Sequence, residues 1–343
     1  MTIQQNHGKR LQNFLNSLTL LAVCVICTIN LASAQTMTTN KDTLINSPLS
    51  LDTLYYKSLL KRLANGDASG KWPVVSTAYP LPGAILPFKR VVAYYGNMYS
   101  KNMGILGQYP PPVMLAKLKE EVKNWETADP NTPVVPALHY ICVTAQAEPG
   151  RNGLHNLRMP FKQIDSVLSM AKSINALVFL DIQVGFSTVE KELPLLEKYL
   201  SLPNVHFGID PEFSMKEGSV PGKRIGTFDA QDINYVTGYL AGLVKKYNLP
   251  PKIFVIHRFT KRMVTNYQAI KLRSEIQVVM DMDGWGSPES KKNTYRNFMT
   301  QEPVQFTGFK LFYKNDIRNA PNRMLTPKEI LALKPSPIYI QYQ

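Results

Sequence analysis

Residues 161–210 read FKQIDSVLSMAKSINALVFLDIQVGFSTVEKELPLLEKYLSLPNVHFGID, and this stretch indicates the fold. Its first segment, 161–174, repeats apolar side chains every three or four residues, which predicts an amphipathic helix. The continuous apolar run at 177–183 is typical of a strand buried on both faces. A second helical segment, 189–200, and a second apolar run, 205–210, repeat the pattern. Alternating strand and helix predicts a parallel sheet covered by helices.

The same pattern extends in both directions along the chain. Eight short apolar or β-branched runs occur, at 90–96, 133–140, 177–183, 205–210, 252–257, 276–281, 306–312 and 338–341. Segments with helical spacing separate most of them, at 113–125, 161–174, 189–200 and 230–247. Strand then helix, repeated eight times, predicts an α/β fold of the (β/α)8 TIM-barrel class. The alternative is a doubly wound open sheet, but no Gly-rich phosphate turn follows an early strand.

The first 34 residues have the features of a secretory signal peptide. Lys9 and Arg10 precede a short apolar run that closes at Ala32-Ser33-Ala34, a small-x-small cleavage site. We therefore expect cleavage before Gln35 and an exported protein, periplasmic or extracellular, and we include association with the cell envelope in that expectation. An uncleaved membrane anchor is the weaker alternative because polar residues interrupt a run that is already short.

Composition shifts divide the chain into three predicted parts. Residues 1–34 form the signal peptide, and residues 35–88 form a flexible arm and N-terminal extension that carries one short amphipathic helix at 51–63. Residues 89–343 form the (β/α)8 barrel domain, which is long enough to bury a core of its own.

The charge and the cysteines limit the partners and the redox chemistry. The net charge of +14 falls to +12 on cleavage, and the basic residues are scattered, so we expect anionic surroundings and no nucleic-acid partner. Of the three cysteines only Cys142 survives cleavage, which excludes an internal disulfide. Its apolar setting predicts a buried, unreactive thiol.

Nearly every predicted strand changes from apolar to polar where it ends. Active sites of this fold class are built from the carboxyl ends of the strands, so these polar groups are the candidates for a shared site. They are Tyr94, Tyr95, His139, Asp181, Gln183, Asp210, Glu212, His257, Arg258, Asp281, Asp283, Trp285, Lys310, Tyr339 and Gln341.

The end of the fourth strand carries the sharpest chemical signal. Alternation directs Gly208, Asp210 and Glu212 to the lumen, and places the two carboxylates roughly 7 Å apart along the backbone. We interpret Glu212 as a general acid with a raised pKa and Asp210 as the group that orients it. The alternative is that both acids only neutralise nearby Lys or Arg side chains.

The sixth strand repeats this arrangement with Asp281 and Asp283 on one face, followed by Trp285. These two acids and Asp181 are the candidates for a second catalytic carboxylate. An aromatic ring beside carboxylates suits the apolar face of a sugar, although Trp285 packing under a loop is an equal alternative. The remaining predicted substrate-binding residues are Tyr94, Tyr95, His139, Gln183, His257, Arg258, Lys310 and Tyr339.

Other reaction classes have less support in the sequence. His139 and His257 lack the short His spacings typical of zinc hydrolases, so we predict no metal ligand and no cofactor. A Gly-x-Ser-x-Gly motif is absent, and Cys142 has no obvious base, so nucleophilic Ser or Cys catalysis is disfavoured.

A set of motifs resembles a group of secreted bacterial proteins that are uncharacterised or described as cell-wall or lipoprotein-like. The motifs are VAYYG at 92–96, MGILG at 103–107, LDIQVG at 180–185, GIDPEFSM at 208–215, VPG at 220–222, IHRF at 256–259 and DMDGWGSP at 281–288. This resemblance covers residues 90–342 and implies a glycosidase-like barrel.

The chain also shows a distant similarity to the chitinase-like glycoside hydrolases. It rests on the tyrosine pair at 94–95 and on Gly208-Ile209-Asp210-Pro211-Glu212. This similarity implies substrate-assisted cleavage of an N-acetylated sugar by Asp210 and Glu212.

The sequence therefore predicts a secreted glycoside hydrolase that acts on a glycan or cell-envelope polysaccharide. Two alternatives remain open, namely a noncatalytic protein that binds an envelope polymer and a metal-dependent phosphodiesterase. We expect a monomer whose partner is a carbohydrate or anionic envelope polymer, with no integral membrane partner.

Overall fold

The computed structural model describes residues 51–74, 78–319 and 321–343. The predicted signal peptide, 1–34, and the first part of the predicted arm, 35–50, lie outside the described residues. Within the described ranges, no helix combines the length and the apolar character needed to cross a membrane.

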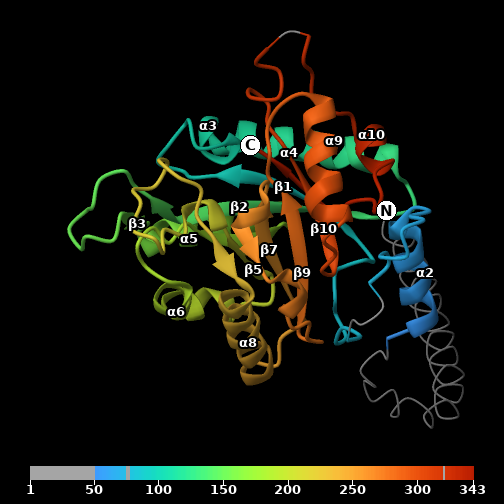
Figure 1. Cartoon of the computed structure of the whole chain (residues 1–343), viewed down its shortest axis with the longest axis horizontal. Helices are drawn as coiled ribbons and strands as arrows, with labels where there is room; N and C mark the ends of the chain where they lie inside the picture. The colour runs from blue at the N-terminus through green and yellow to red at the C-terminus, as the bar shows by residue number, and fades with distance from the viewer. Residues whose placement is uncertain (1–50, 75–77, 320) are drawn as a thin grey trace, which may run out of the picture. The chain divides into compact units, whose positions relative to one another are not determined.

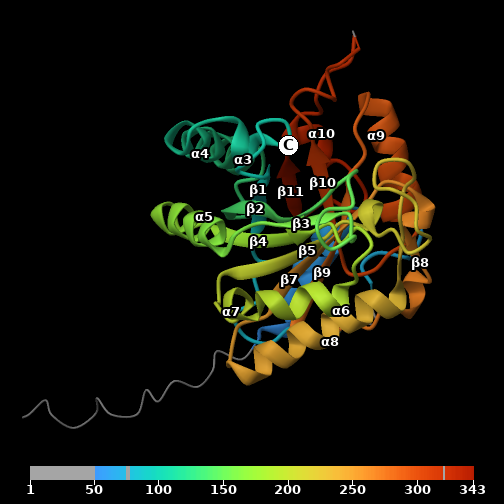
Figure 2. The ribbon, with the colours of Figure 1, turned by 90° about the vertical axis from the view of Figure 1, so that its left-hand side faces the viewer.

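Eight parallel strands of the described chain form a closed barrel, because β1 pairs with both β2 and β11 (Figures 1 and 2). The barrel strands are β1 (Arg90–Gly96), β2 (Val134–Ala145), β4 (Leu177–Ile182), β5 (Val205–Ile209), β7 (Lys252–Arg258), β9 (Ile276–Met282), β10 (Phe306–Leu311) and β11 (Tyr339–Tyr342). The predicted (β/α)8 barrel is confirmed, and the open-sheet alternative is wrong.

Helices connect most of the strands and lie outside the barrel, as Figure 2 shows for α4, α5 and α8. They are α3 (Ile105–Gln108), α4 (Pro111–Ala128), α5 (Phe161–Ser173), α6 (Val189–Glu192), α7 (Glu197–Leu200), α8 (Ala230–Lys246), α9 (Pro288–Tyr295) and α10 (Pro327–Leu331). The single helix predicted at 189–200 is divided by a 3-10 turn at Leu193–Leu196, which contains Pro194. Proline lacks the amide hydrogen that a continuous helix needs.

One connection departs from the eightfold repeat. Between β7 and β9 the chain forms only short 3-10 turns and the two-residue strand β8 (Val264–Thr265), which pairs with β6 (Phe228–Asp229). The other irregularity is at β2, which runs five residues past its predicted end at Tyr140 and pairs there with β3 (Asn156–Arg158). Cys142 therefore lies inside a strand, where burial raises its pKa, in agreement with an unreactive thiol.

Alternation along β5 follows the prediction. Val205, Phe207 and Ile209 pack in the shell between strands and helices, and Gly208 faces the lumen. The amino-terminal half of the lumen is apolar, and its buried side chains are Leu86, Val91, Ala93, Ala137, Phe179, Val255, Val279, Phe306 and Tyr339. The buried acids of the lumen, Asp181 and Asp281, lie in the other half.

The amino end of the barrel is closed by the segment that precedes β1. Helix α2 (Thr53–Ala64) places Leu63 against the apolar lumen, and the Leu63 carbonyl accepts a hydrogen bond of 2.7 Å from the Ser336 amide. Gln277 of β9 accepts from the amides of Ile85 and Leu86 at 3.0 and 3.1 Å and donates to the Leu86 carbonyl. The Gln277 side chain thus holds residues 85–86 of the extension at the end of the lumen.

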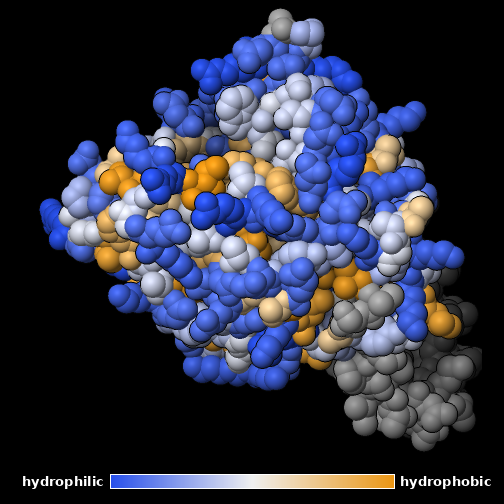
Figure 3. Space-filling model, in the orientation of Figure 1, coloured by the Kyte–Doolittle hydropathy of each residue, from blue (hydrophilic) through white to orange (hydrophobic). Residues whose placement is uncertain are grey.

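The face of the molecule drawn in Figure 3 is mainly hydrophilic, with hydrophobic residues in small separate patches. Scattered apolar side chains of this kind are normal on a solvated surface. The hydrophobic core consists of the buried side chains between the strands and the helices and of those in the apolar half of the lumen.

Replacing Gln277 with alanine is expected to destabilise the barrel. The change leaves two amides and one carbonyl at 85–86 without partners, and each buried group left unpaired costs about 1–3 kcal/mol. Urea unfolding should therefore show a loss of at least about 2 kcal/mol. The exposed Gln231→Ala should change stability by less than about 0.5 kcal/mol. Equal stability of the two variants would contradict the role given to Gln277.

Candidate active site

A cleft of about 530 Å³ opens at the carboxyl ends of the barrel strands. Seven of the predicted residues line it within the described chain, namely Tyr95, Gln183, Asp210, Glu212, Asp283, Trp285 and Lys310. Sequence reasoning missed the loop residues that complete the wall, among them Asn102, Met103, Phe259 and Phe312. Each of these four lies in the loop that follows a strand, and that position was the signal available in the sequence.

The chain turns sharply after β5, and this turn sets the positions of Asp210 and Glu212. Asp210 caps the one-turn 3-10 helix Pro211–Phe213, with Oδ1 accepting from the Glu212 amide at 3.1 Å. Its Oδ2 accepts from Gln183 Nε2 at 3.2 Å. Asp210 is only 3% exposed, and burial raises its pKa. Asp210 thus positions the turn that presents Glu212 to the cleft.

Glu212 is partly buried in the cleft wall. Its side chain makes no hydrogen bond or ion pair with the described residues. Burial raises the pKa of Glu212, and the negative charge of Asp283 raises it further, while Lys310 and His257 oppose the shift. Glu212 is therefore suited to carry a proton near neutral pH.

Asp283, which follows β9, has the opposite electrostatic setting. Its Oδ1 lies 2.8 Å from Lys310 Nζ, and its Oδ2 lies 3.3 Å from His257 Nδ1. Burial alone would raise the pKa of Asp283, but the charges of Lys310 and His257 outweigh burial and lower it to about 2. Trp285, two residues further on, lines the same cleft and is 52% exposed. The cleft thus combines a protonated acid, an ionised acid and an open aromatic face.

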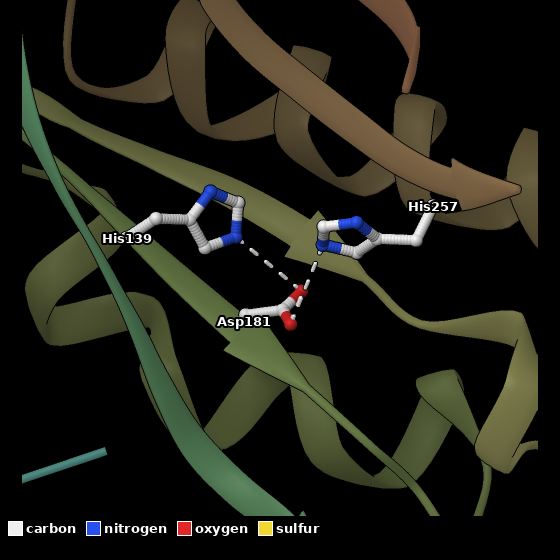
Figure 4. A group of neighbouring side chains, drawn as sticks. All are labelled: His139, Asp181 and His257. Atoms are coloured by element: carbon white, nitrogen blue, oxygen red, sulfur yellow. Dashed lines mark ion pairs between the residues drawn. The ribbon is translucent and has the colours of Figure 1, made fainter. Parts of the chain in front are cut away.

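Four other predicted residues meet below the cleft instead of in its wall. His139 from β2, Asp181 from β4 and His257 from β7 point toward one another in the lumen and are fully buried (Figure 4). The Nε2 atoms of both histidines lie 3.6 Å from Asp181 oxygens, and Tyr95 donates a 3.0 Å hydrogen bond to Asp181. Asp281, also fully buried, lies 3.3 Å from His257 Nδ1. Of the described residues, His139, Asp181 and His257 form a group that could hold a metal ion.

Besides His139 and His257, three further predicted substrate-binding residues do not reach the cleft. Tyr94 faces outward from β1, where its hydroxyl lies 3.0 Å from that of Tyr313. Arg258 also faces outward, with its guanidinium over the Phe298 ring and an ion pair to Glu302. Neighbouring residues of a strand point to opposite sides, so Tyr94 and Arg258 cannot share the lumen with Tyr95 and His257.

Tyr339 does face the lumen, but it lies too deep to line the cleft. Its hydroxyl is 2.6 Å from His139 Nδ1 and accepts a 2.9 Å hydrogen bond from Gln341 Nε2. Tyr339 and Gln341 therefore support His139 from below.

A second hollow of about 520 Å³ adjoins the cleft. Consecutive residues line the two, since Phe213 and Phe259 line the cleft while the next residues, Ser214 and Thr260, line the hollow. Four basic residues line the hollow against one acid, Glu217, and they are Lys216, Arg224, Lys261 and Arg262.

No protein-family model matches the chain, and a search of curated proteins found no match. The predicted membership of a group of secreted bacterial proteins therefore stays a prediction.

Solved structures with weak likeness include a hyperthermophilic endo-β-1,4-glucanase in complex with substrate, at 10% identity and a TM-score of 0.37, covering 75% of this chain and 89% of that one. A GH5-4 broad-specificity endoglucanase from Clostridium longisporum has 11% identity and a TM-score of 0.35, with coverages of 66% and 75%. The Ignisphaera aggregans GH53 catalytic domain has 12% identity and a TM-score of 0.36, with coverages of 77% and 86%. Scores this low add nothing to the barrel topology that strand pairing establishes, and they assign no activity.

Replacing Lys310 with methionine is expected to lower the free energy of unfolding by about 3–5 kcal/mol, because it leaves the buried Asp283 without its cation. Urea unfolding at neutral pH measures this loss. The double variant with Asp283→Asn should regain part of it, and Lys314→Met, at an exposed position, should be neutral. A Lys310→Met protein as stable as the unmodified chain would show that the pair contributes nothing.

Proposed function

We propose that this protein is a glycoside hydrolase that cleaves a glycan by carboxylate general acid catalysis. The observation that carries the proposal is the pair Glu212 and Asp283, two acids of one cleft whose surroundings shift their pKa values in opposite directions. Such a pair provides one group that donates a proton and another that acts as an anion.

In this proposal Glu212 donates its proton to the glycosidic oxygen as the bond between that oxygen and the anomeric carbon breaks. In one route the Asp283 carboxylate attacks the anomeric carbon directly. In the other route it deprotonates the water that attacks this carbon. Water supplies the hydroxyl of the new sugar end, and the stereochemistry of the product distinguishes the two routes. Asp181 and Asp281 are sealed below the cleft, which supports Asp283 as the second carboxylate.

The walls of the cleft support a sugar as the substrate. Trp285 offers a half-exposed ring for the apolar face of a pyranose, and Gln183 and Lys310 offer hydrogen-bond donors. The adjoining basic hollow suits anionic groups on a longer chain, so we infer that a carbohydrate or anionic envelope polymer is the natural partner.

We also propose that the enzyme acts outside the cytoplasm as a monomer. Export is supported by the basic residues Lys9 and Arg10, by the short apolar run that follows them and by the Ala32-Ser33-Ala34 site. N-terminal sequencing of the protein secreted by a bacterial host tests the proposed cleavage before Gln35.

Replacing Glu212 with glutamine is expected to lower kcat by about 10²–10⁴-fold, because glutamine has no proton to donate. The assay is release of aryl alcohol from a panel of aryl glycosides, N-acetylglucosaminides included, and of reducing ends from envelope polysaccharides. The loss should be small for substrates with acidic leaving groups, which depart without protonation. The matched control Glu217→Gln, in the adjoining loop, should retain activity on neutral substrates.

Binding of the polysaccharides without cleavage of any substrate would contradict the hydrolase proposal and favour a noncatalytic binding protein. Turnover of phosphodiesters that disappears with a chelator would favour the metal-dependent alternative instead.

The pH profile gives a second test. Protonated Glu212 and ionised Asp283 make up the active form, so kcat/KM should be constant between their pKa values of about 2 and about 7 and fall as the pH rises through about 7. Asp210, Asp283, Lys310 and His257 are the charged or titratable groups that act on Glu212. The alkaline limb should disappear for a substrate with an acidic leaving group, and a limb that persists there would assign the titration to another group.

A further inference from the structure

We propose that the barrel binds one divalent transition-metal ion below the cleft, through Nε2 of His139, a carboxylate oxygen of Asp181 and Nε2 of His257. These ligand atoms come from three strands, β2, β4 and β7, and lie within 4.8 Å of one another. Figure 4 shows the two imidazole rings directed at the carboxylate between them.

The hydrogen bonds behind the rings indicate which nitrogen is available. His257 Nδ1 makes no hydrogen bond to the described residues, but it lies 3.3 Å from both Asp281 Oδ2 and Asp283 Oδ2, the carboxylates to which it can donate. His139 Nδ1 lies 2.6 Å from the Tyr339 hydroxyl and 3.1 Å from Gln341 Nε2, which can only donate, so metal binding through Nε2 requires the Nδ1–H tautomer, with Gln341 donating to the Tyr339 hydroxyl alone. A metal-binding histidine characteristically donates its other N–H in this way, which leaves Nε2 as a lone pair. When the ion is bound, both Nε2 atoms are lone-pair donors, and the ion supplies the positive charge that His257 otherwise carries beside Asp181 and Asp283.

The spacing of the three groups fits coordination better than hydrogen bonding. Each Nε2 lies 3.6 Å from an Asp181 oxygen, which is too long for a hydrogen bond. Ligand atoms around a tetrahedral zinc ion with bonds of about 2.0–2.1 Å are separated by about 3.4 Å. The two nitrogens approach different oxygens of Asp181, and the three ligand atoms lie within 4.8 Å of one another, so the side chains close around the ion when it binds.

Gly208 leaves open the space between these ligands. A Cβ atom at this position would lie 2.5 Å from Asp181 Oδ1 and 2.6 Å from His139 Nε2, so only glycine leaves that space unfilled. The position of this absent Cβ atom thus lies close to two of the ligand atoms, at distances only slightly longer than metal–ligand bonds.

The buried polar atoms of the cluster also lack other partners. His139 Nε2, Asp181 Oδ1, His257 Nε2 and both oxygens of Asp281 make no hydrogen bond to the described residues. With His257 neutral as a ligand, the three buried acids Asp181, Asp281 and Asp283 face one cation, Lys310. A dication therefore offsets charge that burial would otherwise destabilise.

Two imidazoles and one carboxylate suit a borderline ion such as Zn²⁺ or Co²⁺ better than Ca²⁺ or Mg²⁺. All three ligands are fully buried and none lines the cleft, so the ion is structural and ties three strands together. Through Asp181 it also fixes Tyr95, whose ring forms part of the cleft wall.

The experiment is metal binding by the full-length chain. The protein is stripped with a chelator, loaded with Zn²⁺ or Co²⁺, desalted and analysed for bound metal by plasma mass spectrometry. We expect about one equivalent per chain, visible absorption bands of four-coordinate Co²⁺, and a higher melting temperature with metal than without. Failure of the unmodified protein to retain zinc or develop cobalt bands would overturn the proposal, and protonated histidine would then be the cation of the cluster.

Variants locate the site. Asp181→Asn and His257→Gln should each weaken zinc binding at least tenfold, on the scale of about 10–100-fold known for altered metal surroundings. His206→Gln is the matched control, because His206 is equally buried in the lumen but lies outside the ligand group. If a variant fails to fold, the cobalt spectrum of the unmodified protein still decides the question. Unchanged zinc binding by both folded variants would place the metal elsewhere and refute the site.

Discussion

The polar half of this barrel depends on one buried carboxylate, Asp181. Tyr95 donates to it, and His139 and His257 are directed at it from two other strands. A carboxylate with no solvent exposure is stable only when neighbouring groups offset its charge, so the positions of these three side chains are tied to its own. Because Tyr95 also forms part of the cleft wall, the network below the cleft helps to set the shape of the surface above it.

Depth along the strand separates acids that are otherwise alike. Asp281 and Asp283 face the same side of β9, roughly 7 Å apart along the backbone. The first is sealed in the lumen beside His257, and the second reaches the cleft and pairs with Lys310. Asp283 can therefore contact a ligand in the cleft, whereas Asp281, two residues earlier, supports the network below the cleft.

The apolar runs of the sequence predicted all eight barrel strands, because strands covered on both faces are apolar along most of their length. Sequence also indicated Asp210, Glu212 and Asp283 as cleft residues, since a strand that turns polar at its carboxyl end marks this face of a barrel. It could not separate Tyr94 from Tyr95, because that requires the parity of the strand, and both residues are aromatic.

Two further features were beyond sequence reasoning. The group His139, Asp181 and His257 comes from three strands and has no characteristic spacing, so a search for short histidine motifs cannot reveal it. Sequence position shows which residues follow a strand, but not which of them, such as Asn102 and Phe259, reach the cleft, because the course of each loop depends on the whole fold.

The clasp between Gln277 and the backbone at 85–86 lies at the opposite end of the lumen from the cleft, with a layer of apolar side chains between them. Because this layer separates the two ends of the lumen, we expect a mutation at one end to have little effect on the structure of the other. A lineage carrying this barrel is therefore free to vary the length and sequence of its N-terminal segment, provided the clasp is kept. The loops around the cleft can diversify toward new ligands on an independent evolutionary course.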